Sequence, residues 1–283
     1  LAKLDVIEAA IDRCQQLAFC LDYDGTLTPI VENPSEALLS EEARAVVRAL
    51  AWRYPTAIVS GRARATAQGL VQVENLYYAG SHGMDILGPR GASFQVSDSF
   101  RPALEEAAAK VSEALSNVQG VIVEDNNFSI SVHYRMVPEE PERAKVAQAV
   151  ADLVASMPMR RRAPGQMAYE MRPSADWHKG KAVEWLLERI RKEKEGSVFP
   201  VYIGDDLTDE DAFKVMHDLG GIAIIVSDSA TAENTAASYA LQSPVEVVAF
   251  LDHFAQRGSE RELIALQAQA LHDLEQCVGA SPP

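Results

Sequence analysis

The stretch FCLDYDGTLTPI, residues 19–30, ends an apolar run in two carboxylates, Asp22 and Asp24, with Gly25 and Thr26 behind them. The run from residue 17 to 21 predicts a buried strand, and in open parallel sheets binding sites form where strands end. Two carboxylates this close repel each other unless a cation holds them or one keeps a proton. Mg²⁺ binds one or two carboxylates together with phosphate oxygens. The stretch therefore predicts a metal-dependent phosphate site, with a solvated loop or a calcium loop as alternatives.

Further apolar runs and helical patterns alternate on both sides of this stretch. Helices are expected at residues 5–16, at 40–54 with Ser40 as the N-cap, and at 208–219. The other expected strands are residues 56–60, 76–80, 199–204 and 222–226. Continuous apolar strands alternating with helices indicate an α/β fold with a mostly parallel sheet covered on both faces.

The middle of the chain has a different pattern. Residues 121–135 predict two strands joined by a turn, the second with alternating apolar and polar side chains, and residues 167–173 predict a third. Helical patterns flank them at 101–117 and 139–156. We expect residues 84–173 to be an inserted α+β domain with an antiparallel sheet, between two core segments at 1–83 and 174–258. Residues 259–283 are expected to be a helical tail.

Composition narrows the class of protein. The 283 residues are 47% hydrophobic and carry a formal charge of −15, which argues against nucleic acid or an anionic membrane as partner. No apolar run approaches the ~20 residues of a membrane-spanning helix. Three cysteines, Cys14, Cys20 and Cys277, fit no metal motif and suit a reducing compartment. We expect a cytoplasmic monomer, with organellar targeting left open because the sequence begins at Leu1.

Three more polar clusters follow expected strands or precede an expected helix. Ser60 opens SGR (60–62), where a hydroxyl and the following amides can bind a phosphate oxygen, although a simple turn is the alternative. DWHKGKA (176–182) offers Lys179 or Lys181 to pin a phosphate, with His178 expected to be a surface neighbour. YIGDDLTDEDAF (202–213) has more carboxylates than helix capping needs, which predicts a cation site formed by Asp205, Asp206 and Asp209.

The four clusters in this order resemble the haloacid dehalogenase-like phosphatases, and more narrowly the trehalose-6-phosphate phosphatase family. LDYDGTLTPI, PTAIVSGR, LYYAGSHGMDI, SISVHYR, DWHKGKA and PVYIGDDLTDEDAFK carry the resemblance, which runs from about residue 17 to 253. It implies Mg²⁺-dependent hydrolysis of a sugar phosphate by a core domain with an inserted cap.

The resemblance also implies roles for individual residues. Asp22 would be the nucleophile, and Asp24 would protonate the leaving sugar oxygen and then deprotonate water. Mg²⁺ would be bound by the Asp22 side chain, the Asp24 carbonyl and Asp205, with Asp206 and Asp209 orienting water around the metal or the lysine. Ser60 and Lys179 would hold the phosphoryl oxygens; Lys179 is preferred because KGKA fits the family's Lys-Gly-x-Ala pattern. Substrate contacts are expected from Thr26, Gly61 and Arg62.

The expected cap supplies candidates for reading the hydroxyl groups of a disaccharide phosphate. They are Glu124, Asn126, His133, Arg135, Glu170 and Arg172, with His82 near the entry to the cap. Residues 160–162, all arginine, are expected in a solvated loop. Three alternatives remain: a phosphatase for another sugar phosphate such as sucrose 6-phosphate, a sugar-phosphate sensor without turnover, and a calcium module. The last lacks the usual Glu at the end of a twelve-residue loop, because position 33 is Asn.

Overall fold

A computed structural model describes residues 16–96, 98–138, 140–157, 159–165, 167–194, 197–227 and 235–256 of the chain. The helix expected at residues 5–16 lies outside this part except for Gln16. The expected tail at 259–283 also lies outside it, as do Cys14 and Cys277. Cys20 is a free, buried thiol.

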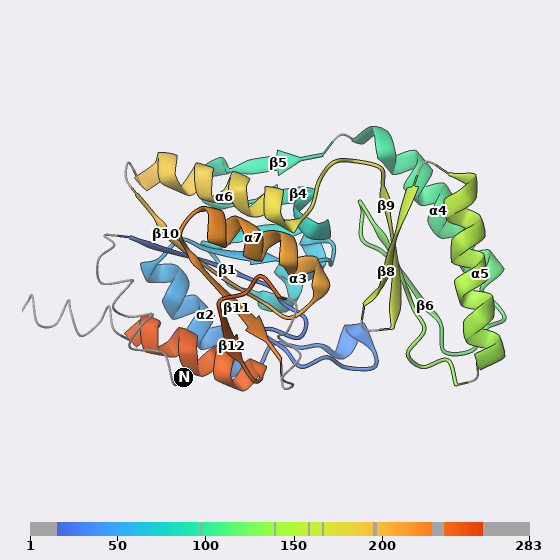
Figure 1. Ribbon diagram of the computed structural model, residues 1–283, viewed down its shortest axis with the longest axis horizontal. Helices are drawn as coiled ribbons and strands as arrows, with labels where there is room; N and C mark the ends of the chain where they lie inside the picture. Colours follow the sequence, from blue (N-terminus) through green and yellow to red (C-terminus); the bar gives the residue numbers. More distant parts are fainter. Residues whose placement is uncertain are drawn as a thin grey trace, which may run out of the picture.

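The larger sheet has eight strands in the order β12-β11-β10-β1-β2-β3-β4-β5 (Figure 1). The first six are parallel, and every residue of β1 and β2 is buried, as expected for apolar strands covered on both faces. The α/β prediction and the expected strands are confirmed. The bounds of all eight strands, of which β4, β5 and β12 were not expected, are β1 Leu17–Leu21, β2 Thr56–Val59, β3 Tyr77–Gly80, β4 Asp85–Leu87, β5 Ser93–Gln95, β10 Phe199–Gly204, β11 Ile222–Val226 and β12 Tyr239–Leu241.

Helices cover both faces of this sheet (Figure 1). On one face lie α2 (Glu41–Arg53) and a helical segment at residues 244–256; on the other lie α6 (Lys179–Lys194) and α7 (Glu210–Asp218). Two separate hydrophobic clusters fill the two interfaces. The helix α2 begins where expected, since the Ser40 hydroxyl accepts a hydrogen bond from the amide of Ala43 at 3.1 Å. A short helix, α3 (Arg64–Val71), connects β2 to β3.

The smaller sheet is antiparallel, with strand order β6-β7-β9-β8, and is built from the middle of the chain. Its alternating strand β7 buries Ile130 and Val132, which pack with α4 and α5 in a third hydrophobic cluster. Figure 1 shows these helices on the side of the sheet that faces away from the larger sheet. The bounds are α4 Arg101–Ala114, β6 Ile122–Asp125, β7 Ile130–His133, α5 Glu140–Ser156, β8 Met159–Gly165 and β9 Ala168–Pro173.

Two details differ from expectation. Residues 85–95, which we placed in the insertion, form β4 and β5 and pair antiparallel with the larger sheet, so the smaller layer starts after them. Residues 160–162 are not in a loop: they lie in β8, because the backbone pairs with β9. Within the part of the chain that the structure describes, no helix has the length and apolar character needed to cross a membrane.

Candidate active site

The two opening carboxylates lie where β1 ends. Asp22 is buried and its amide still bonds to Ile203 in the neighbouring strand β10, which fixes it at the edge of the sheet. The chain then turns sharply at Gly25, whose φ is +82°. A Cβ at Gly25 would lie 2.0 Å from a carboxylate oxygen of Asp205. Glycine is therefore required for this turn to bring the ends of β1 and β10 together.

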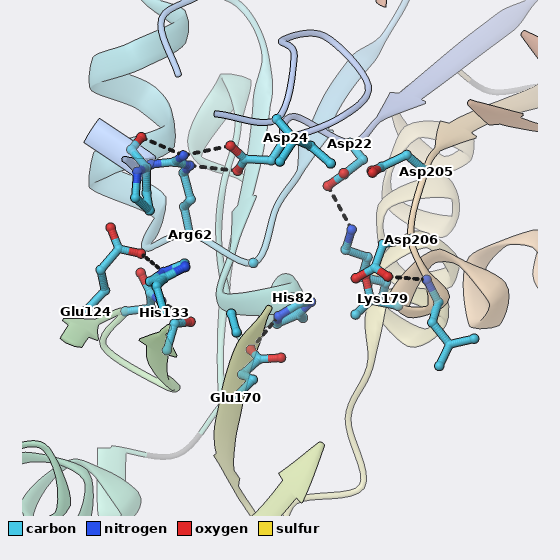
Figure 2. Close-up of a pocket in the computed structure, with 18 of the residues that line it drawn as sticks. Asp22, Asp24, Arg62, His82, Glu124, His133, Glu170, Lys179, Asp205 and Asp206 are labelled. Carbon is cyan, nitrogen blue, oxygen red and sulfur yellow. Dashed lines mark hydrogen bonds and ion pairs between the residues drawn. The ribbon is translucent and has the colours of Figure 1, made fainter. Parts of the chain in front are cut away.

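Lys179 begins α6 and is buried between two carboxylates. Its Nζ donates to Oδ1 of Asp22 and to Oδ1 of Asp209, each at 2.7 Å (Figure 2 shows the first pair). Burial alone would lower the pKa of Lys179, but the two carboxylates outweigh it and raise the pKa above its usual value, so the lysine stays charged. Lys181 instead pairs with Asp176 at the surface, at 2.5 Å. The geometry therefore places Lys179, and not Lys181, in the site.

Carboxylates from two strand ends form a cluster suited to a cation. One oxygen from each of Asp22, Asp205 and Asp209 lies within 4.8 Å of the others. Burial raises the pKa of Asp22 and of Asp205, and the neighbouring carboxylates add to the effect. A hard divalent cation with oxygen ligands, such as Mg²⁺, would relieve this repulsion, so the donor set fits the expected metal. Asp206 lines the cavity beside the cluster and accepts a hydrogen bond from the amide of Leu207 at 2.6 Å.

The turn after β2 brings Arg62 to Asp24. The guanidinium donates from Nε to Oδ2 of Asp24 at 2.7 Å and from Nη2 to Oδ1 at 2.6 Å, and Nη2 also donates to the Pro34 carbonyl (Figure 2). The Ser60 hydroxyl oxygen, which is buried, accepts the amide of Arg62 at 3.1 Å. The loops after β1 and β2 are thus tied together through one arginine.

The smaller sheet supplies the opposite wall of the cavity. Glu124 and His133 pair across β6 and β7 at 2.7 Å, and the side-chain amide of Asn126 donates to the Ser131 hydroxyl at 3.1 Å. The oxygen of the same Asn126 amide accepts the backbone amide of Ala63 at 3.2 Å. These side chains line the cavity, where their polar atoms can contact a hydroxyl-rich ligand.

His82 connects the two walls. Its Nε2 lies 2.5 Å from Oε1 of Glu170 in β9, and the other oxygen of Glu170 accepts from Arg172 at 2.5 Å. Burial lowers the pKa of His82 to about 4, with Arg172 adding to the shift and Glu170 opposing it. Burial would raise the pKa of Glu170, but His82 and Arg172 outweigh it and hold the pKa well below its usual range. We therefore describe the pair at neutral pH as a neutral imidazole donating to a carboxylate.

Two local features fix the position of His82. Ser81 and His82 both have left-handed backbone angles, with φ of 48° and 57°, and such conformations cluster at functional sites. A Cβ on Gly61 would come within 2.9 Å of the His82 ring, so the SGR turn needs its glycine for this close approach.

One cavity brings most of the expected residues together (Figure 2). It is lined by Asp22, Asp24, Gly61, Arg62, His82, Glu124, Asn126, His133, Arg135, Glu170, Lys179, Asp205 and Asp206. Four expected residues are not among its lining: Thr26, Ser60, Arg172 and Asp209 are buried behind it. The hydroxyl of Thr26 donates to Asp205 at 3.5 Å, and Arg172 contacts Glu170, which lines the cavity. His178 lies near Asp211, at 3.7 Å, and does not line the cavity.

The sequence did not point to several lining residues. They are Ile30, Val31, Pro34, Ser131, Ala168, Leu207 and Thr208. Most are neighbours of recognised residues in the chain, and the segment 30–34 directly follows the Asp-x-Asp-Gly-Thr motif. The guanidinium of Arg135 donates to the carbonyl of Val31, which connects the smaller sheet to this segment.

A mostly parallel sheet with a buried aspartate, a buried lysine and a carboxylate cluster at its strand ends, facing a smaller antiparallel sheet, defines the class: a haloacid dehalogenase-like phosphatase. The sequence model for trehalose-phosphatase matches residues 20–245. The chain belongs to this family, whose members are phosphoric monoester hydrolases.

Curated relatives agree with this assignment, and a solved structure shares the fold. Over 259 residues, covering 88% of this chain and 69% of the relative, it is 42% identical to "Probable trehalose-phosphate phosphatase D" of Arabidopsis thaliana. It is also 42% identical over 277 residues to "Trehalose 6-phosphate phosphatase RA3" of Zea mays, covering 93% and 76% of the two chains. The fold is similar to the C-terminal domain of a C. albicans trehalose-6-phosphate phosphatase, with a TM-score of 0.73, 21% identity and coverage of 90% and 97%.

Proposed function

We propose that this protein hydrolyses trehalose 6-phosphate to trehalose and inorganic phosphate. The observation that carries the proposal is the position of Lys179, charged and in contact with Asp22, in a cavity whose far wall is formed by Glu124, Asn126 and Glu170. The ammonium of Lys179 and the carboxylate of Asp22 are the groups that would bind and attack a phosphoryl group. The polar side chains of the far wall can form hydrogen bonds with a sugar that has many hydroxyls. Relatives at 42% identity that are named for this substrate support the choice of sugar.

In the proposed first step, an oxygen of Asp22 attacks phosphorus and the bond from phosphorus to the sugar oxygen breaks. Asp24 gives a proton to that oxygen, so that trehalose leaves as a neutral alcohol and Asp22 carries an acyl phosphate. Lys179 neutralises charge on the phosphoryl oxygens during transfer, and Ser60 helps to position the turn that carries Arg62.

In the second step, water attacks the phosphorus of the aspartyl phosphate while Asp24 takes a proton from that water. Phosphate leaves and Asp22 returns as a carboxylate. Asp22, Asp205 and the Asp24 carbonyl would hold Mg²⁺, which when bound offsets the negative charge gathered by the carboxylates and the phosphate. The layer from α4 to β9 would serve as the cap, selecting the sugar and excluding water during the first step.

The test is phosphate release from trehalose 6-phosphate, sucrose 6-phosphate, glucose 6-phosphate and an aryl phosphate, each with Mg²⁺ and with a chelator. An Asp22→Asn preparation made in parallel reports any contaminating phosphatase. We expect Mg²⁺-dependent release that strongly favours trehalose 6-phosphate. Preference for sucrose 6-phosphate would replace the substrate, and binding of a sugar phosphate without release would favour a sensor.

A further inference from the structure

A buried tyrosine hydroxyl sits behind the lysine of the site. Tyr202 lies in the middle of β10, is fully buried, and packs its ring edge-on against Phe213 of α7, with ring centres 5.7 Å apart. Its hydroxyl donates to Oδ1 of Asp209 at 2.5 Å. That same oxygen accepts the Nζ of Lys179. Tyr202, Asp209, Lys179 and Asp22 therefore form one continuous chain of hydrogen bonds from the core of the sheet to the cavity.

The second oxygen of Asp209 is also occupied. It accepts the backbone amides of Asp205 at 3.2 Å and of Asp206 at 3.0 Å. A carboxylate offers about four acceptor positions, and the four donors take them all. A Cβ at Gly204 would lie 2.4 Å from the carboxyl carbon of Asp209, so a glycine is needed at this end of β10 for the side chain to approach the backbone. All four acceptor positions of Asp209 are therefore taken by donors of the protein, whereas Asp22 and Asp205 line the cavity where a cation would bind.

We propose that Tyr202 is a positioning residue: by donating to Asp209 it limits how strongly that carboxylate draws Lys179 back, and so keeps the ammonium directed at Asp22 and the phosphoryl group. In this arrangement Asp209 anchors the lysine and is not a metal ligand. The inference rests on the proposed function, because it gives Lys179 the phosphoryl-binding role.

The physical reason is competition for one oxygen. Without the hydroxyl, Oδ1 of Asp209 would have Lys179 as its only donor in this network, and the ion pair between them would tighten. The ammonium would then give less of its charge to the transition state, where the phosphoryl oxygens need it most. A group that acts mainly in the transition state changes kcat more than KM.

The experiment compares Tyr202→Phe with Tyr78→Phe. Tyr78 is a matched control, because it is buried in the same sheet and its hydroxyl donates to a backbone carbonyl, that of Val73 at 2.6 Å, away from the cavity. Both variants lose one buried phenol hydroxyl, so we expect similar losses in melting temperature. Only Tyr202→Phe should lower kcat, by about ten- to a hundredfold, with KM nearly unchanged.

A second measurement does not depend on turnover. In protein labelled with ¹⁵N-lysine, the Nζ signal of Lys179, assigned by its loss in Lys179→Arg, should shift in Tyr202→Phe and stay in place in Tyr78→Phe. If the wild type released no phosphate, the proposed function would fail, yet this signal would still report on the hydrogen-bond chain. An unmoved signal, or equal kcat in the two variants, overturns the inference and leaves Tyr202 as a core residue.

The role of Asp209 is tested by Mg²⁺ titration calorimetry without substrate. Asp205→Asn should weaken Mg²⁺ binding at least tenfold, whereas Asp209→Asn should change it by less than about threefold while still lowering kcat. Equal weakening in the two variants would make Asp209 a metal ligand and remove that part of the inference.

Discussion

Arg62 binds both carboxylate oxygens of Asp24, at 2.7 and 2.6 Å, in a two-pronged ion pair at the edge of the cavity. Such a pair fixes the direction of a carboxylate more tightly than a single hydrogen bond does. In the proposed mechanism Asp24 transfers a proton to and from the reacting oxygens. The arginine therefore both aims this carboxylate and has to yield one of its oxygens during turnover.

Replacing Arg62 by Lys should lower kcat by about ten- to a hundredfold, because one ammonium cannot orient both oxygens. The matched control is Arg64→Lys, two residues further on, whose guanidinium pairs with Asp85 at 3.0 Å and does not line the cavity. Steady-state kinetics on trehalose 6-phosphate would measure both. Equal rates in the two variants would mean that Arg62 only ties the loops together.

The two lysines of the KGKA segment form a natural pair of variants. Lys179→Met leaves the buried carboxylates of Asp22 and Asp209 without their cation, so we expect loss of turnover and a free energy of unfolding lower by about 3–5 kcal/mol. Lys181→Met removes an exposed ion pair and should cost less than about 1 kcal/mol, with activity retained. Urea unfolding measures the change in stability, and phosphate release measures the change in activity. A Lys181 variant that loses activity while the Lys179 variant keeps it would reverse the assignment.

Selection of the sugar is expected to depend on the smaller sheet. Glu170→Gln should reduce kcat/KM for trehalose 6-phosphate at least tenfold more than for an aryl phosphate, which has no sugar hydroxyls to bind. Glu106→Gln is the control, since Glu106 is exposed on α4 and pairs only with Lys110 at 2.7 Å among the contacts described. Losses of the same size on both substrates would assign Glu170 a structural role beside His82 and Arg172.

Stabilisation by Mg²⁺ should increase with pH. The raised pKa values of Asp22 and Asp205 mean that the folded protein keeps protons which the unfolded chain has released above about pH 4. Without metal, this contribution to stability therefore falls as the pH rises, and it falls through the range between about 4 and the raised values. Mg²⁺ competes with those protons, so its binding and its stabilising effect grow over the same range.

The measurement is the melting temperature with and without Mg²⁺ at about pH 5.5, 7 and 8. The lowered pKa of His82 acts in the opposite direction, because it adds stability as the pH rises from about 4 to the ordinary value near 6.5. Taking the difference between samples with and without metal cancels that contribution. In the wild type, the difference in melting temperature between samples with and without Mg²⁺ should increase with pH. In Asp205→Asn this difference should be smaller than in the wild type. A wild-type difference that does not depend on pH would contradict the prediction.

Local patterns in the sequence were enough to predict five strands of the larger sheet and the polar groups that follow them. Strands such as β1 and β10 are short apolar runs that end in carboxylates. The same stretches of sequence therefore predict both the strands and the polar groups of the site. The strands β4 and β5 lack this pattern, because each has only three residues and Ile86 is the one buried residue among the six. The three consecutive arginines of β8 do not form an apolar or alternating pattern, so the sequence did not predict this strand. It forms because its backbone pairs with β9.

Local sequence patterns could not predict contacts between residues that are far apart in the chain. Arg62 and Asp24 are separated by 38 positions, and the sequence gives no sign that they form an ion pair. Tyr202 stands within an apolar run, where a tyrosine reads as core. A role for its hydroxyl can be inferred only from the folded structure, in which Asp209 lies beside it and accepts its hydrogen bond.

The smaller sheet keeps a hydrophobic cluster of its own, and the contacts described between it and the strand ends are largely polar, such as those of Asn126 with Ala63 and of Glu170 with His82. Mutations can therefore accumulate in the layer proposed to recognise the sugar without loosening the packing around Asp22. Over evolutionary time, such a division lets the same chemistry be passed to a new substrate by rewriting one module, while the other is inherited nearly intact.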